Sequence, residues 1–150
     1  LGQLRHDPMA MLPFCGYHMA DYWQHWLDVG KQGGENMPAV FHVNWFRKDD
    51  DGNWLWPGFG ENLRVLAWIA SRARGEGDAV ETPIGYLPKA DQLGFDELGI
   101  SAAAGAELLN VDADQWKAEA DARDEYFKKF GDRLPTEIQQ ENDALRQRLG

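Results

Sequence analysis

Aromatic residues are concentrated between Phe41 and Asn62, where six of them fall within 22 residues. The six are Phe41, Trp45, Phe46, Trp54, Trp56 and Phe59. Aromatic faces stack on flat ring systems, and each stacked base contributes about 1–3 kcal/mol in complexes of single-stranded nucleic acids. A flat ligand that contains a ring would therefore suit this part of the chain.

Glycine and asparagine residues follow the aromatics. Gly58 and Gly60 remove side chains where a ligand must come close to the backbone, and a helix predicted to start at Glu61 would offer unpaired N–H groups. Asn62 carries hydrogen-bond donors and an acceptor, which can match the edge of a guanine base. These residue types favour a pocket for a nucleotide base.

Three other interpretations of the aromatic residues stay open. Tryptophans beside a Pro-Gly turn commonly pack a core, because a short hairpin must bury area to be stable. Exposed Trp54, Trp56 and Phe59 would also suit a free-standing module that binds sugars or peptides, since stacked aromatics serve those ligands too. The stretch could also be scaffold alone.

Other residues that often carry chemistry favour plainer roles. The four histidines have no H-E-x-x-H spacing and no cysteine partner, so we expect no zinc site. Cys15 lies between Phe14 and Gly16, a setting in which a cysteine packs more often than it reacts. Asp49, Asp50 and Asp51 precede Gly52, which is typical of a solvated turn. Because adjacent strand residues face opposite sides, at most one of Arg47 and Lys48 points toward a pocket.

Charge and composition exclude several classes of function. The net charge is −10, whereas a nucleic-acid surface needs clustered Lys and Arg. No window approaches the roughly 20 apolar residues of a membrane span. The single cysteine cannot form an internal disulfide, which fits a reducing cytoplasm. We expect a cytoplasmic protein that binds neither nucleic acid nor membrane and acts as a monomer.

The elements expected to position these residues follow from periodicity and turn signals. Apolar positions predict a helix from Met19 to about Gly30 and another from Glu61 to Arg74. β-branched and aromatic content predicts a strand over 39–46, with 54–56 returning as the second strand of a hairpin. We expect an ordered loop over 1–18, a loop over 82–88, a helix from Asp112 to Phe130 with a capping box at Gln115, and a last helix that begins at Pro135.

Several motifs together resemble the GTP-dependent phosphoenolpyruvate carboxykinase family. The match covers nearly the whole chain and is least distinctive beyond Gly105. The strings that carry it are Asn44-Trp45-Phe46-Arg47-Lys48-Asp49, Leu55-Trp56-Pro57-Gly58-Phe59-Gly60-Glu61-Asn62, Arg64-Val65-Leu66, His6-Asp7-Pro8-Met9-Ala10-Met11, Pro13-Phe14-Cys15-Gly16-Tyr17 and Thr82-Pro83-Ile84-Gly85-Tyr86-Leu87-Pro88.

The resemblance implies an enzyme that converts oxaloacetate and GTP into phosphoenolpyruvate, GDP and carbon dioxide, at the entry to gluconeogenesis. Trp54 departs from the family pattern, where phenylalanine is expected, so that wall of the pocket would differ in shape. The residues that the resemblance places at the guanine base are Trp45, Phe46, Trp54, Phe59, Gly60, Glu61 and Asn62.

The resemblance also implies that part of the chemistry lies outside this chain. The chain opens on Leu1 rather than Met and contains no G-x-x-x-x-G-K-[ST] string, so we expect the phosphate loop, the lid and the manganese ligands to precede it. We expect one C-terminal piece, 1–150, of a mixed α/β nucleotide-binding lobe, with a short aromatic hairpin and several helices. The pocket region would span 1–111, and C-terminal helices would span 112–150.

Overall fold

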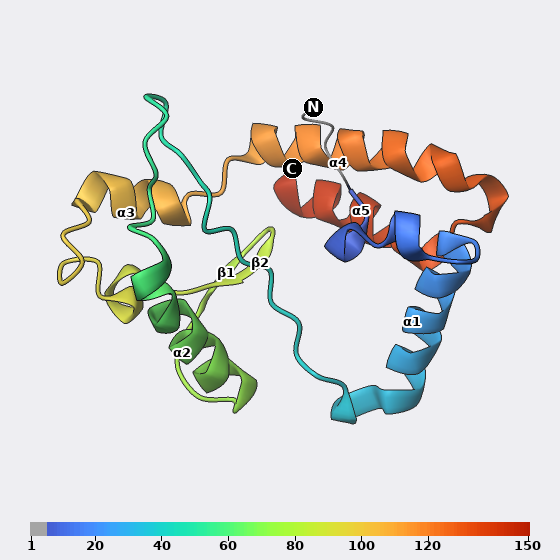
Figure 1. Ribbon diagram of the computed structural model, residues 1–150, viewed down its shortest axis with the longest axis horizontal. Helices are drawn as coiled ribbons and strands as arrows, with labels where there is room; N and C mark the ends of the chain where they lie inside the picture. Colours follow the sequence, from blue (N-terminus) through green and yellow to red (C-terminus); the bar gives the residue numbers. More distant parts are fainter. Residues whose placement is uncertain (1–5) are drawn as a thin grey trace. The chain divides into compact units, whose positions relative to one another are not determined.

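The computed structural model describes residues 6–150, and these form two compact units. One unit contains residues 6–37 and 112–150, and the other contains residues 38–111 (Figure 1). Most of the regular elements in both units are helices, and the second unit also carries a small antiparallel sheet, so the fold is a mixed α/β arrangement as expected. No helix within the described residues has the length and apolar character needed to cross a membrane.

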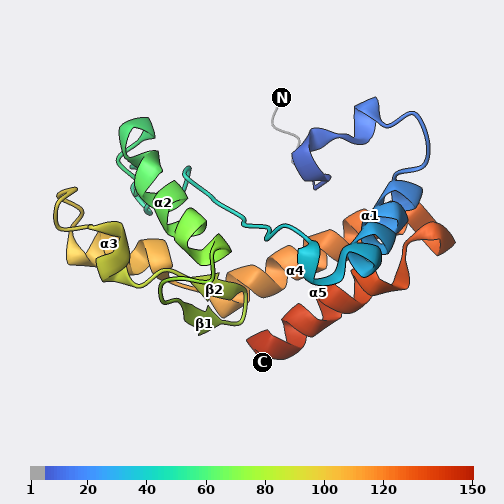
Figure 2. The same cartoon turned by 90° about the horizontal axis from the view of Figure 1, so that it is seen from below.

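The first unit is built from three α-helices: α1 (Met19–Gly33), α4 (Ala113–Phe127) and α5 (Thr136–Leu149). His18 caps α1, because its Nδ1 accepts a hydrogen bond from the backbone N–H of Ala20 at 3.2 Å. α4 and α5 pack side by side (Figure 2). Short 3₁₀ helices complete the unit at Pro8–Ala10, Leu12–Phe14, Gly34–Asn36 and Lys128–Arg133.

Aromatic packing and one polar network stabilise this first unit. The buried core consists of Met19, Ala20, Trp23, Tyr126 and Phe130. Between α4 and α5, the buried amide of Asn142 donates to the carbonyl of Ala120 at 2.9 Å and to Asp124 at 2.7 Å. Burial alone would raise the pKa of the Asp124 carboxyl, but hydrogen bonds from Gln139, Arg146 and Asn142 outweigh it and lower the pKa.

The second unit contains two helices and one hairpin. These are α2 (Asn62–Ala73), α3 (Ala102–Leu109) and the antiparallel strands β1 (Val80–Thr82) and β2 (Gly85–Leu87). In the sheet, Glu81 lies opposite Tyr86. 3₁₀ helices form at Phe59–Glu61 and Ala90–Leu93. The buried core is Trp56, Leu93 and Phe95, and the half-buried Trp45, Val65, Trp68, Leu98, Ile100, Leu108 and Leu109 pack against it.

Several boundaries predicted from the sequence are wrong. The strand expected over 39–46 does not form, because the antiparallel pairing is confined to one bridge between Lys48 and Trp54. The loop expected over 82–88 instead contains the turn and second strand of the β1–β2 hairpin. Helix α3 was not expected, and the helix expected to reach Phe130 changes to 3₁₀ geometry after Phe127.

Gly105 allows α3 to lie against the core of the second unit. A Cβ at Gly105 would lie 2.6 Å from Cδ2 of Phe95, which is itself buried. In an open helix, glycine to alanine stabilises by about 1 kcal/mol. Here the forced shift of Phe95 costs about 1–3 kcal/mol, so we expect Gly105→Ala to lower the free energy of unfolding, measured by urea denaturation.

Gly30→Ala in α1 is the matched control for this prediction. A Cβ at Gly30 meets no atom within 4 Å, so only the helix preference applies and the substitution should stabilise. A Gly105→Ala variant as stable as the Gly30→Ala variant would contradict the expected contact with Phe95.

Candidate functional site

The candidate site begins at a tight turn in the second unit, where the chain folds back on itself. Lys48 and Trp54 form an antiparallel bridge, and backbone hydrogen bonds flank the pair, including Leu55 N–H to the carbonyl of Arg47 at 3.1 Å. The two residues therefore form a non-hydrogen-bonded pair, in which side chains lie close together on the same face. Trp54 is 57% exposed on that face.

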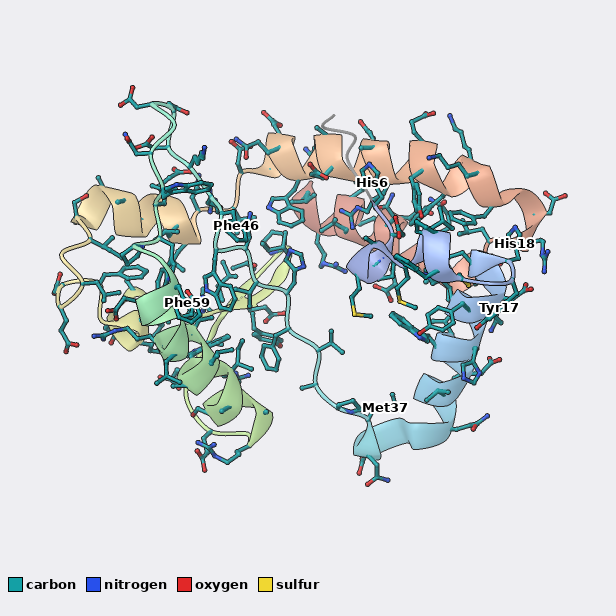
Figure 3. All side chains as sticks on the ribbon, viewed as in Figure 1. His6, Tyr17, His18, Met37, Phe46 and Phe59 are labelled. Carbon is teal, nitrogen blue, oxygen red and sulfur yellow. The ribbon has the colours of Figure 1, made fainter. Side chains whose placement is uncertain are left out.

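Three aromatic residues of this segment are exposed: Phe46 (75%), Trp54 (57%) and Phe59 (92%). We call Phe46, Trp54 and Phe59 the exposed aromatics. The rings of Phe46 and Trp54 meet edge to face, with centroids 5.9 Å apart and an interplanar angle of 70°. Figure 3 shows Phe46 ahead of the turn and Phe59 at the start of α2. Contiguous apolar groups in solvent commonly mark a binding surface, and Phe46 and Trp54 form such a contact.

Gly58 sets the direction in which the chain presents Phe59. Its backbone angles are φ 124° and ψ −169°, a region that essentially only glycine adopts. The 3₁₀ turn Phe59–Glu61 follows and leads directly into α2. Gly60 within this turn faces open space, since a Cβ there would meet no atom within 4 Å.

The other two tryptophans of the segment point inward. Trp56 is 5% exposed and belongs to the buried core, and Trp45 is half-buried and packs against that core. The indole N–H of Trp45 is buried and forms no hydrogen bond within residues 6–150. An orphaned buried donor costs about 1–3 kcal/mol, so the packing of Trp45 against the core carries a cost in stability.

Asn62, the first residue of α2, is oriented by Trp56. The indole N–H of Trp56 donates to Oδ1 of Asn62 at 2.9 Å. An indole nitrogen can only donate, so this contact fixes which end of the amide faces Trp56. The NH2 group of Asn62 is therefore the end that remains for a ligand, and it presents two donors.

Glu61 participates in an ion-pair network on the surface. Its carboxylate lies 3.0 Å from Nε of Arg64, and a second nitrogen of Arg64 lies 2.9 Å from Glu97. The hydrogen bonds to Glu97 and Glu61 raise the pKa of Arg64. The side chain of Glu61 is thus engaged with α2, and its backbone N–H donates to the carbonyl of Gly58 at 3.1 Å.

Arg47 and Lys48 point to opposite sides of the chain. The guanidinium of Arg47 donates to the carbonyl of Leu108 at 3.0 Å and to Glu107 at 2.9 Å, so it ties the turn to α3. The ammonium of Lys48 instead lies 4.2 Å from the centroid of the Trp54 ring. Of these two cations, Lys48 is the one beside the exposed aromatics.

The acidic tip of the turn has a local structural role. The backbone N–H of Asn53 donates to Asp49 at 2.8 Å and its side chain donates at 3.2 Å, and these bonds lower the pKa of the Asp49 carboxyl. Among residues 6–150, no three His, Cys, Asp or Glu side chains come together in a way that could hold a metal ion. The described residues therefore do not fit a manganese site.

Two features of this site were missed by sequence reasoning. One is the bond from Trp56 that orients Asn62, and the other is the position of Lys48 over Trp54. A signal for the second existed, because residues that pair across a tight turn share a face. No sequence signal distinguishes Trp56 as buried from Trp54 as exposed.

Comparison with known proteins gives a consistent result. The sequence profile of the phosphoenolpyruvate carboxykinase C-terminal P-loop domain matches residues 1–148. A phosphoenolpyruvate carboxykinase [GTP] of Treponema pallidum is 52% identical over 99% of this chain and 24% of its own length.

Further relatives carry the same name. The protein of Renibacterium salmoninarum is 50% identical over 100% of this chain and 25% of its own length. The protein of Corynebacterium efficiens is 46% identical over 99% of this chain and 24% of its own length. The chain thus spans about a quarter of the length of these relatives. These matches fit the carboxykinase interpretation and not the sugar- or peptide-binding module.

Proposed function

The chain belongs to the phosphoenolpyruvate carboxykinase C-terminal P-loop domain family, and from this premise we propose that it holds the guanine base of GTP within a longer GTP-dependent carboxykinase. The longer protein would convert oxaloacetate and GTP into phosphoenolpyruvate, GDP and carbon dioxide. It would act in the cytoplasm as a monomer, with manganese bound by residues outside this chain.

One observation carries the proposal: within residues 6–150 the exposed aromatics lie in solvent, whereas Trp56 is buried and Trp45 is half-buried. Phe59 is 92% exposed and Trp56, three residues earlier, is 5% exposed. A protein that needed these rings for its core would bury them, because each buried aromatic contributes a large apolar area. Stacking on a nucleobase is a use of aromatic rings that requires their faces to be accessible.

Asn62 is the residue that we propose to select guanine. Guanine presents the acceptors O6 and N7 on one edge, whereas adenine presents an amino donor in place of O6. The bond from Trp56 occupies Oδ1 of Asn62 and leaves the NH2 donors for a ligand. A donor suits the carbonyl O6 and faces an unfavourable donor in adenine, so the site would prefer GTP to ATP.

The contribution of this chain to the reaction would be binding and orientation. The base lies far from the transferred phosphoryl group, so contacts with the base hold substrate and transition state almost equally. They would place the triphosphate at the phosphate loop of the longer protein, where charge is stabilised during transfer. By itself the chain would bind guanine nucleotides weakly and would not catalyse the reaction.

Asn62→Asp in the longer protein tests this proposal. An aspartate still accepts the hydrogen bond from Trp56, but it replaces the outward NH2 donor with an acceptor. We expect the affinity for GTP to fall about tenfold, as for the loss of one hydrogen bond to a base edge, and the preference for GTP over ATP to shrink. Isothermal titration with each nucleotide measures both.

Two outcomes would count against the proposal. One is a wild-type protein that binds ATP as tightly as GTP, and the other is an Asn62→Asp variant with an unchanged ratio. Quenching of tryptophan fluorescence by sugars but not by nucleotides would instead support the module interpretation.

A further inference from the structure

Lys48 lies beside the exposed aromatics. Unlike the neighbouring cations Arg47 and Arg64, it is not paired with a carboxylate among the described residues. Its ammonium lies 4.2 Å from the ring centroid of Trp54. Within the described part of the chain it forms no ion pair, whereas Arg47 is bonded to Glu107 and Arg64 to Glu61. A cation held on an exposed ring gains little stability there, so it is free to move to a ligand.

The pairing across the turn keeps Lys48 at this place. Lys48 and Trp54 are bridge partners, and the rings of Phe46 and Trp54 meet edge to face. Residues 46, 48 and 54 therefore share the exposed face, while Arg47 points to α3. A base that stacks on Trp54 would lie within a few ångströms of the ammonium.

We propose that Lys48 is a specificity residue of this site, and that its ammonium donates to the O6 and N7 edge of the guanine that stacks beside it. The inference rests on the proposed function. The O6 and N7 acceptors of guanine are a recurrent partner of lysine, and a positive charge disfavours the amino group that adenine carries there. Lys48 would thus act with Asn62 in choosing guanine.

The base edge suits Lys48 better than the phosphates do. The ammonium lies over the Trp54 ring, so a base that stacks on that face would displace it from the ring to the edge of the base. In a guanine nucleotide the ribose and phosphates are attached at N9, on the side of the base opposite to O6. O6 belongs to the six-membered ring, so a cation that contacts O6 is directed away from the phosphate chain.

The test uses Lys48→Met in the longer protein, because methionine keeps the length and the contact with Trp54 but removes the charge and the donors. Titrations at constant ionic strength use GTP, GMP and 7-deaza-GTP, in which N7 is replaced by a C–H group. We expect Lys48→Met to raise the Kd for GTP and the Kd for GMP by the same factor, about tenfold. Wild-type protein should bind 7-deaza-GTP more weakly than GTP, and Lys48→Met should not distinguish them.

Two control variants separate this role from general electrostatics. Lys89 lies in the same unit and is ion-paired with Asp78 at 2.8 Å, so Lys89→Met makes the same charge change elsewhere and should leave the affinity for GTP unchanged. Lys48→Arg keeps a charged donor and should retain most of the affinity for GTP.

Each other outcome overturns the inference. A loss that grows with the number of phosphates would assign Lys48 to the phosphate chain, and an equal loss in Lys89→Met would reduce the effect to net charge. Wild-type affinity in Lys48→Met, with Phe59→Ala still weakened, would remove Lys48 from the site but leave the proposed function standing. A wild-type protein that does not bind GTP would remove both.

Discussion

Replacing Phe59 with alanine in the longer protein should raise the Kd for GTP about five- to 150-fold and leave the melting temperature unchanged. The factor corresponds to the loss of one stacking partner, worth about 1–3 kcal/mol at 1.4 kcal/mol per decade. The melting temperature should hold because Phe59 is 92% exposed, so truncation removes little buried area from this unit. Truncating a phenylalanine in the core would instead cost about 3–5 kcal/mol of stability.

The kinetics of Phe59→Ala should show where the binding energy acts. Contacts with the base persist from substrate to transition state, so their loss should raise the KM for GTP more than it lowers kcat. The KM for oxaloacetate should barely change. Steady-state rates measured with each substrate in turn separate these effects.

Tyr86→Ala provides the matched control for Phe59→Ala. Tyr86 is also an exposed aromatic of the second unit, at 60%, and it lies on β2 rather than beside the turn. Its truncation should leave the KM for GTP unchanged. If Phe59→Ala kept a wild-type KM for GTP and lost thermal stability, Phe59 would be a packing residue and not part of a base platform.

The helices of the first unit could largely be predicted from the sequence. Apolar spacing predicted α1 from Met19, and Asp112 does cap α4, since its carboxylate accepts from the backbone N–H of Gln115 at 3.0 Å. The last helix was expected to begin at Pro135 and begins one residue later, and Leu145 and Leu149 are buried on it. Periodicity is reliable here because each helix buries one continuous face against its neighbours.

The second unit was harder to predict because its short elements depend on long-range contacts. β-branched and aromatic content over 39–46 favoured a strand, but a strand forms only where a partner pairs with it, and the chain turns away at Pro57-Gly58. Helix α3 did carry a local signal, because Ser101 caps it and three alanines follow.

The candidate site shows a similar division. Residue types identified the aromatic segment, and the opposite orientation of Arg47 and Lys48 followed from the alternation of a strand. Composition could not say which tryptophans are buried, since burial is decided by packing against Leu93 and Phe95, more than 30 residues further along the chain. The roles of the seven residues assigned to the guanine base stay predictions, which the variants described above would test.

Trp56 connects the core of the second unit to the candidate site, and Trp56→Ala should have the largest effect on stability. Trp56 is 5% exposed and packs with Leu93 and Phe95. Truncating a buried tryptophan to alanine costs about 3–5 kcal/mol, a large part of the 5–15 kcal/mol that typically stabilises a domain. We expect urea denaturation to show this loss, with GTP binding sharply weakened because Asn62 also loses the indole that orients it.

Trp56→Phe separates the support of the core from the orientation of Asn62. Phenylalanine keeps most of the buried ring but lacks the N–H that donates to Oδ1 of Asn62 at 2.9 Å. The loss of stability should be smaller than for alanine. The amide of Asn62 would then be free to turn its oxygen outward, so the preference for GTP over ATP should fall although the protein remains folded.

A double-mutant cycle of Trp56→Phe with Asn62→Ala decides whether Trp56 acts through Asn62. If it does, the two substitutions remove the same interaction with guanine, and their effects on the free energy of GTP binding should not add. Once Asn62 is alanine, adding Trp56→Phe should change the Kd for GTP very little. Additive losses would mean that Trp56 affects the nucleotide only through the packing of the core, and that Asn62 presents its donors without the help of the indole.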